Sequence, residues 1–172
     1  MNAYILCGGQ SKRMGRDKAL LPFRGIAMAQ YISQSLYRAG FSHVYAVVKE
    51  TLPLAIPQIM EPQSTFHPLF GVHTALEHSS APLSIITPCD LPFVSEATFK
   101  RLRSKEIFTT TYSDAQSQPL LGIFPKTLAK HALHYAEQSL SVMNFVKKSE
   151  RLKIPKYELV NINTPQNLKE NQ

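Results

Sequence analysis

The sequence predicts an α/β fold with three layers, in which helices cover both faces of a mostly parallel sheet. Through about the first 105 residues, apolar runs that suit strands alternate with segments of helical periodicity, which is the pattern of a parallel sheet with right-handed crossovers. The runs at 3–7 and 83–87 are almost continuously apolar, as expected for strands covered on both faces. The helical pattern at 26–39 ends at Gly40, a common C-terminal stop.

The remaining elements follow in chain order. The expected first part comprises a strand at 3–7, a helix at 26–39, strands at 43–48 and 55–60, a helix at 69–79, a strand at 83–87 and a helix at 96–103. Ser95 is a suitable cap for the last of these helices, and Glu96 suits its first turn. The expected second part comprises strands at 107–112 and 119–124, helices at 126–135 and 139–149, and a last strand at 157–163. We expect a single domain over 1–172.

The composition restricts the function classes. The chain of 172 residues has 44% hydrophobic and 18% charged residues, as a soluble globular protein does. Its two cysteines, Cys7 and Cys89, are too few for a disulfide framework. The N-terminus runs straight into an apolar strand and no run could span a membrane, so we expect a cytoplasmic protein without a signal peptide.

The net charge is +7, and a dense group of cations lies beside two glycines. Four cations fall within seven positions: Lys12, Arg13, Arg16 and Lys18. Such a dense patch suits a small polyanion better than the extended stripe that tracks a nucleic acid. No zinc finger or RNA-binding aromatic motif accompanies it. Nucleic-acid binding is therefore a minor alternative, and we expect no nucleic-acid partner.

The segment after the first strand has the chemistry of a polyphosphate site. Glycines permit close backbone approach, and successive amides can form a concave anion site. A hydroxyl, a planar guanidinium and a mobile ammonium follow. The residues expected to contact the nucleotide here are Leu6, Cys7, Gly8, Gly9, Ser11, Arg13 and Lys18. The spacing fits neither a Walker loop nor a dinucleotide-binding loop, and a bare strand-to-helix turn would not need four cations.

The same stretch, L-C-G-G-Q-S-K-R-M-G-R-D-K followed by A-L-L-P, resembles the signature loop of the molybdenum cofactor guanylyltransferase family. That family belongs to the nucleotide-diphospho transferases, which have a glycosyltransferase-A-like fold. The resemblance implies that the chain transfers GMP from GTP to the terminal phosphate of molybdenum-bound molybdopterin. Residues 1–105 would form the nucleotide-binding half and 106–172 the acceptor-binding half. Further partners implied are cofactor-delivery proteins and the molybdoenzymes that receive the product.

A carboxylate ends the buried strand at 83–87. Asp90 lies in P-C-D-L-P-F, which resembles the metal-binding motif of the family, and Mg²⁺ prefers one or two carboxylates together with phosphate oxygens. We therefore expect Asp90 to bind Mg²⁺ and to act in catalysis with Arg13 and Lys18; a turn cap is the alternative. Cys89 is expected to be a packed thiol rather than a nucleophile.

Another segment resembles the family's base-binding region. His67-Pro68-Leu69-Phe70-Gly71 is similar to G-P-L-x-G, with His67 in place of the first glycine. This implies nucleotide contacts from Pro68, Leu69 and Gly71. Glu61 occupies the position where the family usually has an aspartate near the guanine, one methylene shorter.

Two later motifs suggest the acceptor side and a second metal ligand. Gln118-Pro119-Leu120 resembles the family's Q-P-L, so Gln118 and Pro119 are expected to bind the acceptor. Asn161-Ile162-Asn163-Thr164-Pro165 resembles N-x-N-T-P, which implies acceptor binding by Asn161 and metal binding by Asn163. A helix cap is the structural alternative for these asparagines.

Besides nucleic-acid binding, two rival functions remain open at this stage. The loop is shared with enzymes that transfer cytidylyl or uridylyl groups to molybdopterin or to a sugar or polyol phosphate, although D-K-A-L-L-P favours the molybdenum branch. A nucleotide-binding regulator without catalysis is a rival from another class, and it would not need the metal set of Asp90 and Asn163.

Overall fold

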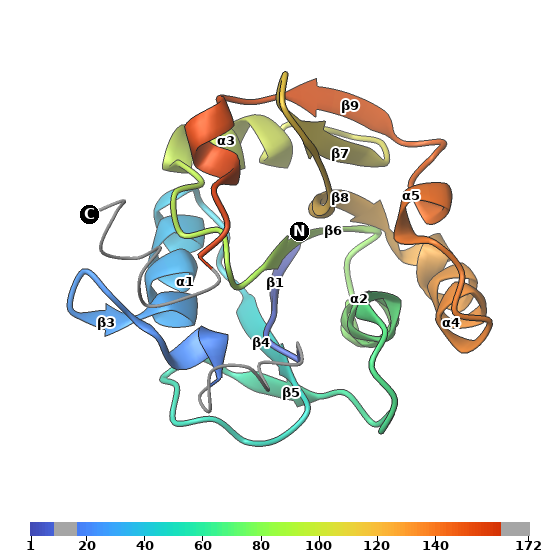
Figure 1. Cartoon of the computed structure of the whole chain (residues 1–172), viewed down its shortest axis with the longest axis horizontal. Helices are drawn as coiled ribbons and strands as arrows, with labels where there is room; N and C mark the ends of the chain where they lie inside the picture. Colours follow the sequence, from blue (N-terminus) through green and yellow to red (C-terminus); the bar gives the residue numbers. More distant parts are fainter. Residues whose placement is uncertain (9–16, 163–172) are drawn as a thin grey trace.

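The computed structural model describes residues 1–8 and 17–162, and they form a three-layer α/β/α structure (Figure 1). The central sheet has seven strands in the order β5-β4-β1-β6-β8-β7-β9. Their bounds are β1 (Asn2–Leu6), β4 (Val44–Val48), β5 (Gln58–Met60), β6 (Leu83–Pro88), β7 (Thr109–Tyr112), β8 (Ser117–Pro125) and β9 (Glu150–Lys153). Only β8 runs against its neighbours among these described strands. The mostly parallel sheet is confirmed.

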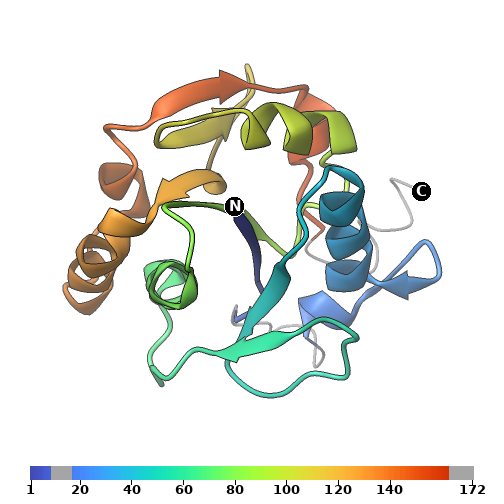
Figure 2. The same cartoon turned by 180° about the vertical axis from the view of Figure 1, so that it is seen from behind.

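Helices cover both faces of the sheet. Helices α1 (Met28–Arg38) and α3 (Glu96–Arg103) lie on one face, and α2 (Pro68–His78), α4 (Ala129–Glu137) and α5 (Val142–Phe145) lie on the other. The view from behind shows the same two groups on opposite sides of the strands (Figure 2).

Alternation along β1 explains the two cores. Ile5 packs with the core on the α1 side, while Tyr4 packs with the core on the α2 side, and both are fully buried. Successive side chains of a strand point to opposite faces, so a strand between two helical layers must be apolar at every position. The continuous apolar run at 3–7 has this cause.

Local signals set several element ends as expected. Helix α1 ends where Gly40 adopts φ +92, a left-handed conformation that glycine tolerates best. The hydroxyl of Ser95 accepts a hydrogen bond from the Thr98 amide at 3.1 Å, and α3 spans the expected residues. Between β2 (Pro22–Phe23) and β3 (Ile26–Ala27), Arg24 and Gly25 both have positive φ, as a two-residue hairpin turn requires.

The C-terminal part differs from the prediction. The expected strand at 157–163 is wrong, because Lys156–Leu159 forms the 3-10 helix η3, and β9 is the last strand within the described part of the chain. β9 reads E-R-L-K and has no fully buried residue, so this edge strand lacks the apolar signal of a covered one. The expected helix at 139–149 is only the short α5, which begins after the Ser141 cap.

This topology places the informative loops at one edge of the sheet. β1, β4, β5 and β6 are parallel, so the residues that follow them meet at their common carboxyl end, where open α/β sheets bind ligands. None of the helices in 1–8 and 17–162 is both long and apolar enough to cross a bilayer.

Candidate functional site

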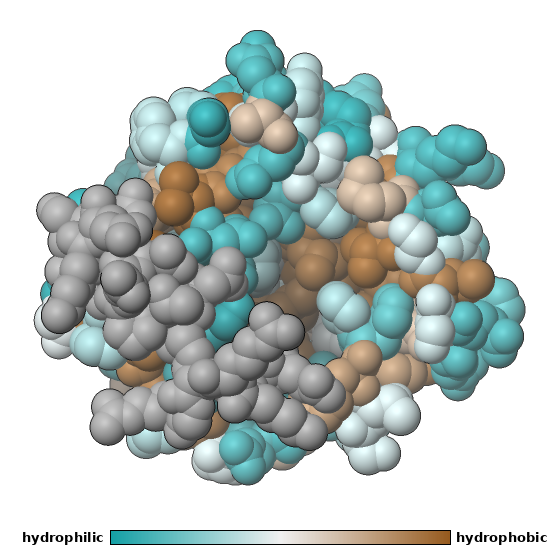
Figure 3. All heavy atoms as spheres, in the orientation of Figure 1, coloured by the Kyte–Doolittle hydropathy of each residue, from teal (hydrophilic) through white to brown (hydrophobic). Residues whose placement is uncertain are grey.

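A pocket of about 450 Å³ opens at the carboxyl ends of the parallel strands. In the space-filling view, the middle of this face is hollowed and hydrophobic side chains are visible in the hollow (Figure 3). The described residues that line the pocket are Leu6, Cys7, Gly8, Asp17, Lys18, Val47, Glu61, Phe66, His67, Pro68, Gly71, Pro88, Cys89, Asp90 and Leu120. Eight of the predicted site residues are in this set.

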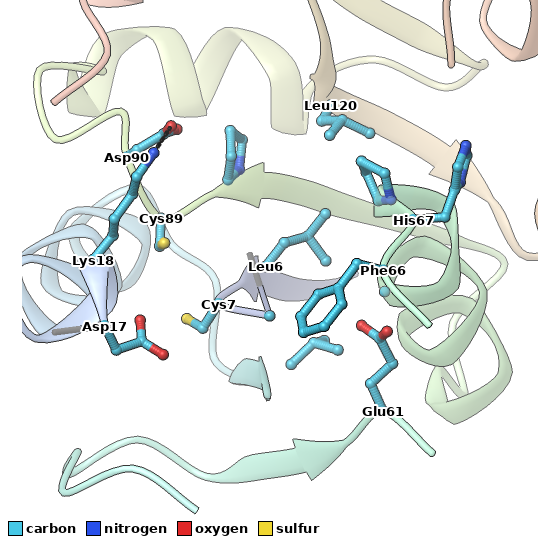
Figure 4. A pocket seen from close by; sticks show the side chains of 15 residues that line it. Leu6, Cys7, Asp17, Lys18, Glu61, Phe66, His67, Cys89, Asp90 and Leu120 are labelled. Atoms are coloured by element: carbon cyan, nitrogen blue, oxygen red, sulfur yellow. Dashed lines mark ion pairs between the residues drawn. The ribbon is translucent and has the colours of Figure 1, made fainter. Parts of the chain in front are cut away.

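One end of the pocket is charged and is built from two chain segments. Lys18 begins the 3-10 helix η1 (Lys18–Leu20), and Asp90 follows β6. The Lys18 Nζ lies 3.7 Å from Asp90 Oδ2, and the side chains are 26% and 20% exposed. Figure 4 shows this pair on the side of the pocket away from Glu61. Burial raises the pKa of Asp90, and the nearby charge of Lys18 opposes that shift.

The C-terminal segment is tied to the same end. The Ile162 amide donates a hydrogen bond to the Asp90 carbonyl at 2.9 Å. Ile162 is fully buried whereas Asn161 is exposed, as alternation along an extended segment requires. Ile162, the central residue of the N-x-N motif, is therefore anchored beside Asp90.

Asp17 is a second carboxylate at this end that the sequence reasoning missed. Its side chain accepts a hydrogen bond from the Ala19 amide at 2.9 Å, which caps η1. Burial raises its pKa, and that hydrogen bond opposes the shift. The available signal was the position of this aspartate next to Lys18 in R-D-K, but the sequence pattern assigned it no role.

The other end of the pocket has an apolar wall and one buried carboxylate. Glu61 follows β5, and its Oε1 lies 2.6 Å from Lys49 Nζ. Burial raises the pKa of Glu61, while the hydrogen bond and charge of Lys49 oppose this. Phe66 and His67 follow in the chain, and Figure 4 shows both on the same side as Glu61. An apolar slot with a single acceptor suits a flat heteroaromatic ring that carries N–H groups.

His67 also has a structural task. Its Nδ1 accepts from the Leu69 amide at 3.3 Å, which caps α2, and its Nε2 lies 3.0 Å from the Leu140 carbonyl. Because Nδ1 is used as an acceptor, a neutral ring carries its proton on Nε2 and donates to Leu140. His67 thus links the start of α2 to the loop before α5.

The two cysteines lie side by side in the pocket floor. The neighbouring strands β1 and β6 pair Leu6 with Pro88, and the next residues are Cys7 and Cys89. Both thiols are buried. The hydrogen bond with Cys7, and then burial, raise the pKa of Cys89 well above its usual value. A thiol held protonated in this way is a poor nucleophile, as expected of packing residues.

Some predicted site residues lie elsewhere. Leu69 is fully buried in the core on the α2 side and does not line the pocket. Gln118 and Pro119 are half-buried in β8 next to Leu120, which does line it. Asn161 is exposed. Four further predicted residues fall outside the described ones: Gly9, Ser11, Arg13 and Asn163.

Within residues 1–8 and 17–162, no group of three or more His, Cys, Asp or Glu side chains could by itself hold a metal ion. The donors at the charged end are hard carboxylate oxygens, from Asp90 and Asp17. This donor set fits a cation such as Mg²⁺, which takes few protein ligands and completes its shell with phosphate oxygens and water. It does not fit a protein-enclosed zinc or calcium site.

Comparison with known families gives one match over most of the chain. The family described as "MobA-like NTP transferase domain" matches residues 3–152. Among curated relatives, a "probable molybdenum cofactor guanylyltransferase" of Flavobacterium johnsoniae is 30% identical over 133 residues, which are 74% of this chain and 70% of the relative. A "molybdenum cofactor guanylyltransferase" of Helicobacter pylori is 28% identical and the match covers 93% and 86% of the two chains.

Solved structures share the fold. Molybdopterin-guanine dinucleotide biosynthesis protein A of Archaeoglobus fulgidus superposes with a TM-score of 0.78 at 18% identity, covering 99% of this chain and 96% of that one. The 2-C-methyl-D-erythritol 4-phosphate cytidylyltransferase of Thermus thermophilus superposes with a TM-score of 0.71 at 15% identity, with 99% and 96% covered. The nucleotidyltransferase fold is thereby confirmed.

Proposed function

The chain belongs to the MobA-like NTP transferase family, and from this premise we propose that it transfers GMP from GTP to the terminal phosphate of molybdenum-bound molybdopterin. The products are molybdopterin guanine dinucleotide and pyrophosphate. The observation that carries the proposal is the agreement between the names of the curated relatives and a two-ended pocket, with charged groups at one end and an apolar slot with Glu61 at the other.

The reaction needs positioning and charge neutralisation more than proton transfer. An oxygen of the acceptor's terminal phosphate attacks the α-phosphorus of GTP, and the bond to the bridging oxygen of pyrophosphate breaks in line. A phosphate monoester is already largely ionised near neutral pH, so no general base is required. The protein's task is to hold both phosphates together and to balance the charge that grows on the leaving group.

The charged end of the pocket provides these groups. The Lys18 ammonium would neutralise the leaving pyrophosphate, and the backbone of Gly8 lets the phosphates approach the end of β1. Arg13 and the amide of Gly9 are proposed for the same polyphosphate, and Ser11 for a hydroxyl contact. Asp90, joined by Asn163, would hold Mg²⁺, which supplies electrostatic stabilisation of phosphate oxygens when bound.

The apolar end would hold the base. Leu6, Phe66 and Pro68 line it, and Glu61 presents a carboxylate to a base whose edge carries N–H donors. Guanine has two such donors, at N1 and N2, whereas cytosine and adenine present an acceptor at the corresponding position. The carboxylate therefore favours guanine over both.

The acceptor would lie on the side of β8 and the C-terminal segment. Gln118, Pro119 and Asn161 are proposed to bind molybdopterin, since β8 brings Leu120 to the pocket wall and Ile162 is hydrogen-bonded to Asp90. We also propose a cytoplasmic location, delivery proteins that bring molybdopterin, and molybdoenzymes that take the product.

Pyrophosphate release from GTP with molybdenum cofactor as the acceptor tests the function. We expect release that depends on both substrates and on Mg²⁺, and little release with CTP, UTP or ATP. Release only with a sugar phosphate as the acceptor, or only with CTP, would move the protein to a sugar-phosphate or cytidylyl branch. Nucleotide binding without turnover on any acceptor would make it a regulator.

A further inference from the structure

Lys49, which follows β4, holds the segment 61–66 in place at the base end of the pocket. Its Nζ lies 2.6 Å from Oε1 of Glu61, 2.6 Å from the carbonyl of Gln63 and 2.9 Å from the carbonyl of Thr65. An ammonium has three N–H donors, and these acceptors use all three. The side chain is 18% exposed and is not part of the pocket wall. Lys49 therefore acts on the pocket through its neighbours.

The aromatic wall depends on the same ammonium. Lys49 Nζ lies 4.7 Å from the ring centroid of Phe66, which is within the range of a cation–π contact. Phe66 lines the pocket although it is 47% exposed, and such an exposed ring would otherwise be free to rotate. In Figure 4 the ring lies next to the Glu61 carboxylate. One cation thus fixes both the ring and the carboxylate that face the base.

The two carboxylate oxygens of Glu61 have different surroundings. Oε1 is held by Lys49, whereas Oε2 lies 3.2 Å from where a Cβ on Gly8 would be and 3.3 Å from where a Cβ on Gly71 would be. Both glycines line the pocket. Among the described residues, no hydrogen bond involves Oε2. A carboxylate can only accept hydrogen bonds, so Oε2 is an acceptor at the pocket wall.

We propose that Lys49 is a positioning residue that sets base selectivity. Its ion pair with Glu61 Oε1 leaves Oε2 as a fixed acceptor for a base with N–H donors. The inference rests on the proposed function and adds to it the residue that makes Glu61 discriminate. Lys49 touches no substrate atom in this scheme. Its effect is expected in KM for GTP, with kcat changed much less.

An amide at position 61 makes the proposal testable. Lys49 only donates, so with Glu61→Gln it draws the amide oxygen toward itself and leaves the NH₂ group facing the base. The N–H donors of guanine then face another donor. Adenine N1 is an acceptor, so it can accept a hydrogen bond from the amide. We expect the GTP-to-ATP ratio, that is, the association constant for GTP divided by that for ATP, to fall roughly 10- to 100-fold.

The second variant separates positioning from general support. In Lys49→Met/Glu61→Gln nothing draws the amide oxygen away, so the amide can rotate and offer its oxygen to guanine. We expect the GTP-to-ATP ratio of the double variant to lie between that of Glu61→Gln and that of the wild type. A purely structural role for Lys49 predicts the opposite, because loosening the segment cannot restore selectivity. The ratio is the right readout since both purines use the same aromatic wall.

The measurement is equilibrium binding of GTP and of ATP, each with Mg²⁺, to the full chain. Lys105→Met is the matched control, because Lys105 also lies near a carboxylate, 3.8 Å from Glu150, but away from the pocket; its GTP-to-ATP ratio should equal that of the wild type. A double variant with a ratio no higher than that of Glu61→Gln overturns the proposal.

If the double variant does not fold, Lys49→Met alone decides the matter. Its GTP-to-ATP ratio must fall by roughly tenfold or more, as for the loss of one charge-assisted contact, and an unchanged ratio overturns the proposal. Failure of the proposed function has a different signature. The wild type would then prefer another nucleotide, or would release no pyrophosphate from GTP with molybdenum cofactor.

Discussion

The Lys18 ammonium lies 3.7 Å from the Asp90 carboxylate, which joins the end of the N-terminal loop to the end of β6. These are the two described groups to which the sequence assigns catalytic roles. They lie in one place because β1 and β6 are adjacent and parallel. Binding of a cation by Asp90 and of phosphate by Lys18 would break this contact. The two new contacts must then outweigh the one that is lost.

Asp90→Asn should strongly lower turnover while the fold persists. Loss of a charge aimed at the reacting phosphates typically lowers the rate roughly 10²–10³-fold. Burial raises the pKa of Asp90, so the neutral amide removes a desolvated charge and the melting temperature should not fall. Pyrophosphate release and thermal melting check both parts. Asp114→Asn is the control, because that side chain is 81% exposed; near-normal turnover in Asp90→Asn would contradict the assignment.

Lys18→Met should lower kcat by a similar factor, roughly 10²-fold or more, because the leaving pyrophosphate loses its cation. Single-turnover pyrophosphate release is the measurement. Lys105→Met replaces a half-buried lysine beside Glu150 that does not line the pocket, and it should leave turnover unchanged. Equal rates in the two variants would remove Lys18 from the mechanism.

Gly71→Ala should weaken GTP binding without unfolding the protein. Alanine is favoured over glycine inside a helix by up to about 1 kcal/mol, but here the new Cβ would lie 3.2 Å from Leu6 Cδ2 and 3.3 Å from Glu61 Oε2. The gain in helix propensity and the close contacts of the new Cβ have opposite effects on stability. The displaced Glu61 carboxylate, in contrast, weakens binding of the base. We expect KM for GTP to rise several-fold. Glu77→Ala, an exposed position in α2, should show no rise.

Lys49→Met should destabilise the protein more at pH 8 than at pH 5. Removing one partner of a buried ion pair costs about 3 kcal/mol or more when the other charge stays ionised. Burial already raises the pKa of Glu61 and Lys49 opposes that shift, so the variant raises it further. Glu61 of the folded variant then keeps a proton that the unfolded chain has released. The loss of unfolding free energy caused by the substitution is therefore smaller in acid. Urea unfolding at the two pH values measures it; an equal deficit at both would show that Glu61 stays ionised.

Much of the fold could be predicted because its signals are local. A continuous apolar run predicts a strand covered on both faces, Gly40 ends α1, and Ser95 begins α3. The edge strand β9 gave no such signal, since none of its residues is fully buried on either face. The segment predicted as a strand at 157–163 instead forms η3, where the buried Glu158 accepts hydrogen bonds from the amide and hydroxyl of Ser95.

The sequence by itself determined the α/β class, the strand ends that carry the loop and Asp90, and the family. Only the tertiary structure decided that Lys49 pairs with Glu61, that Asp17 faces the pocket, and that β8 runs against its neighbours. The reason is physical. Propensity, caps and strand covering depend on residues within a few positions, whereas a buried ion pair depends on the register between β4 and β5, which is set by packing across the whole sheet.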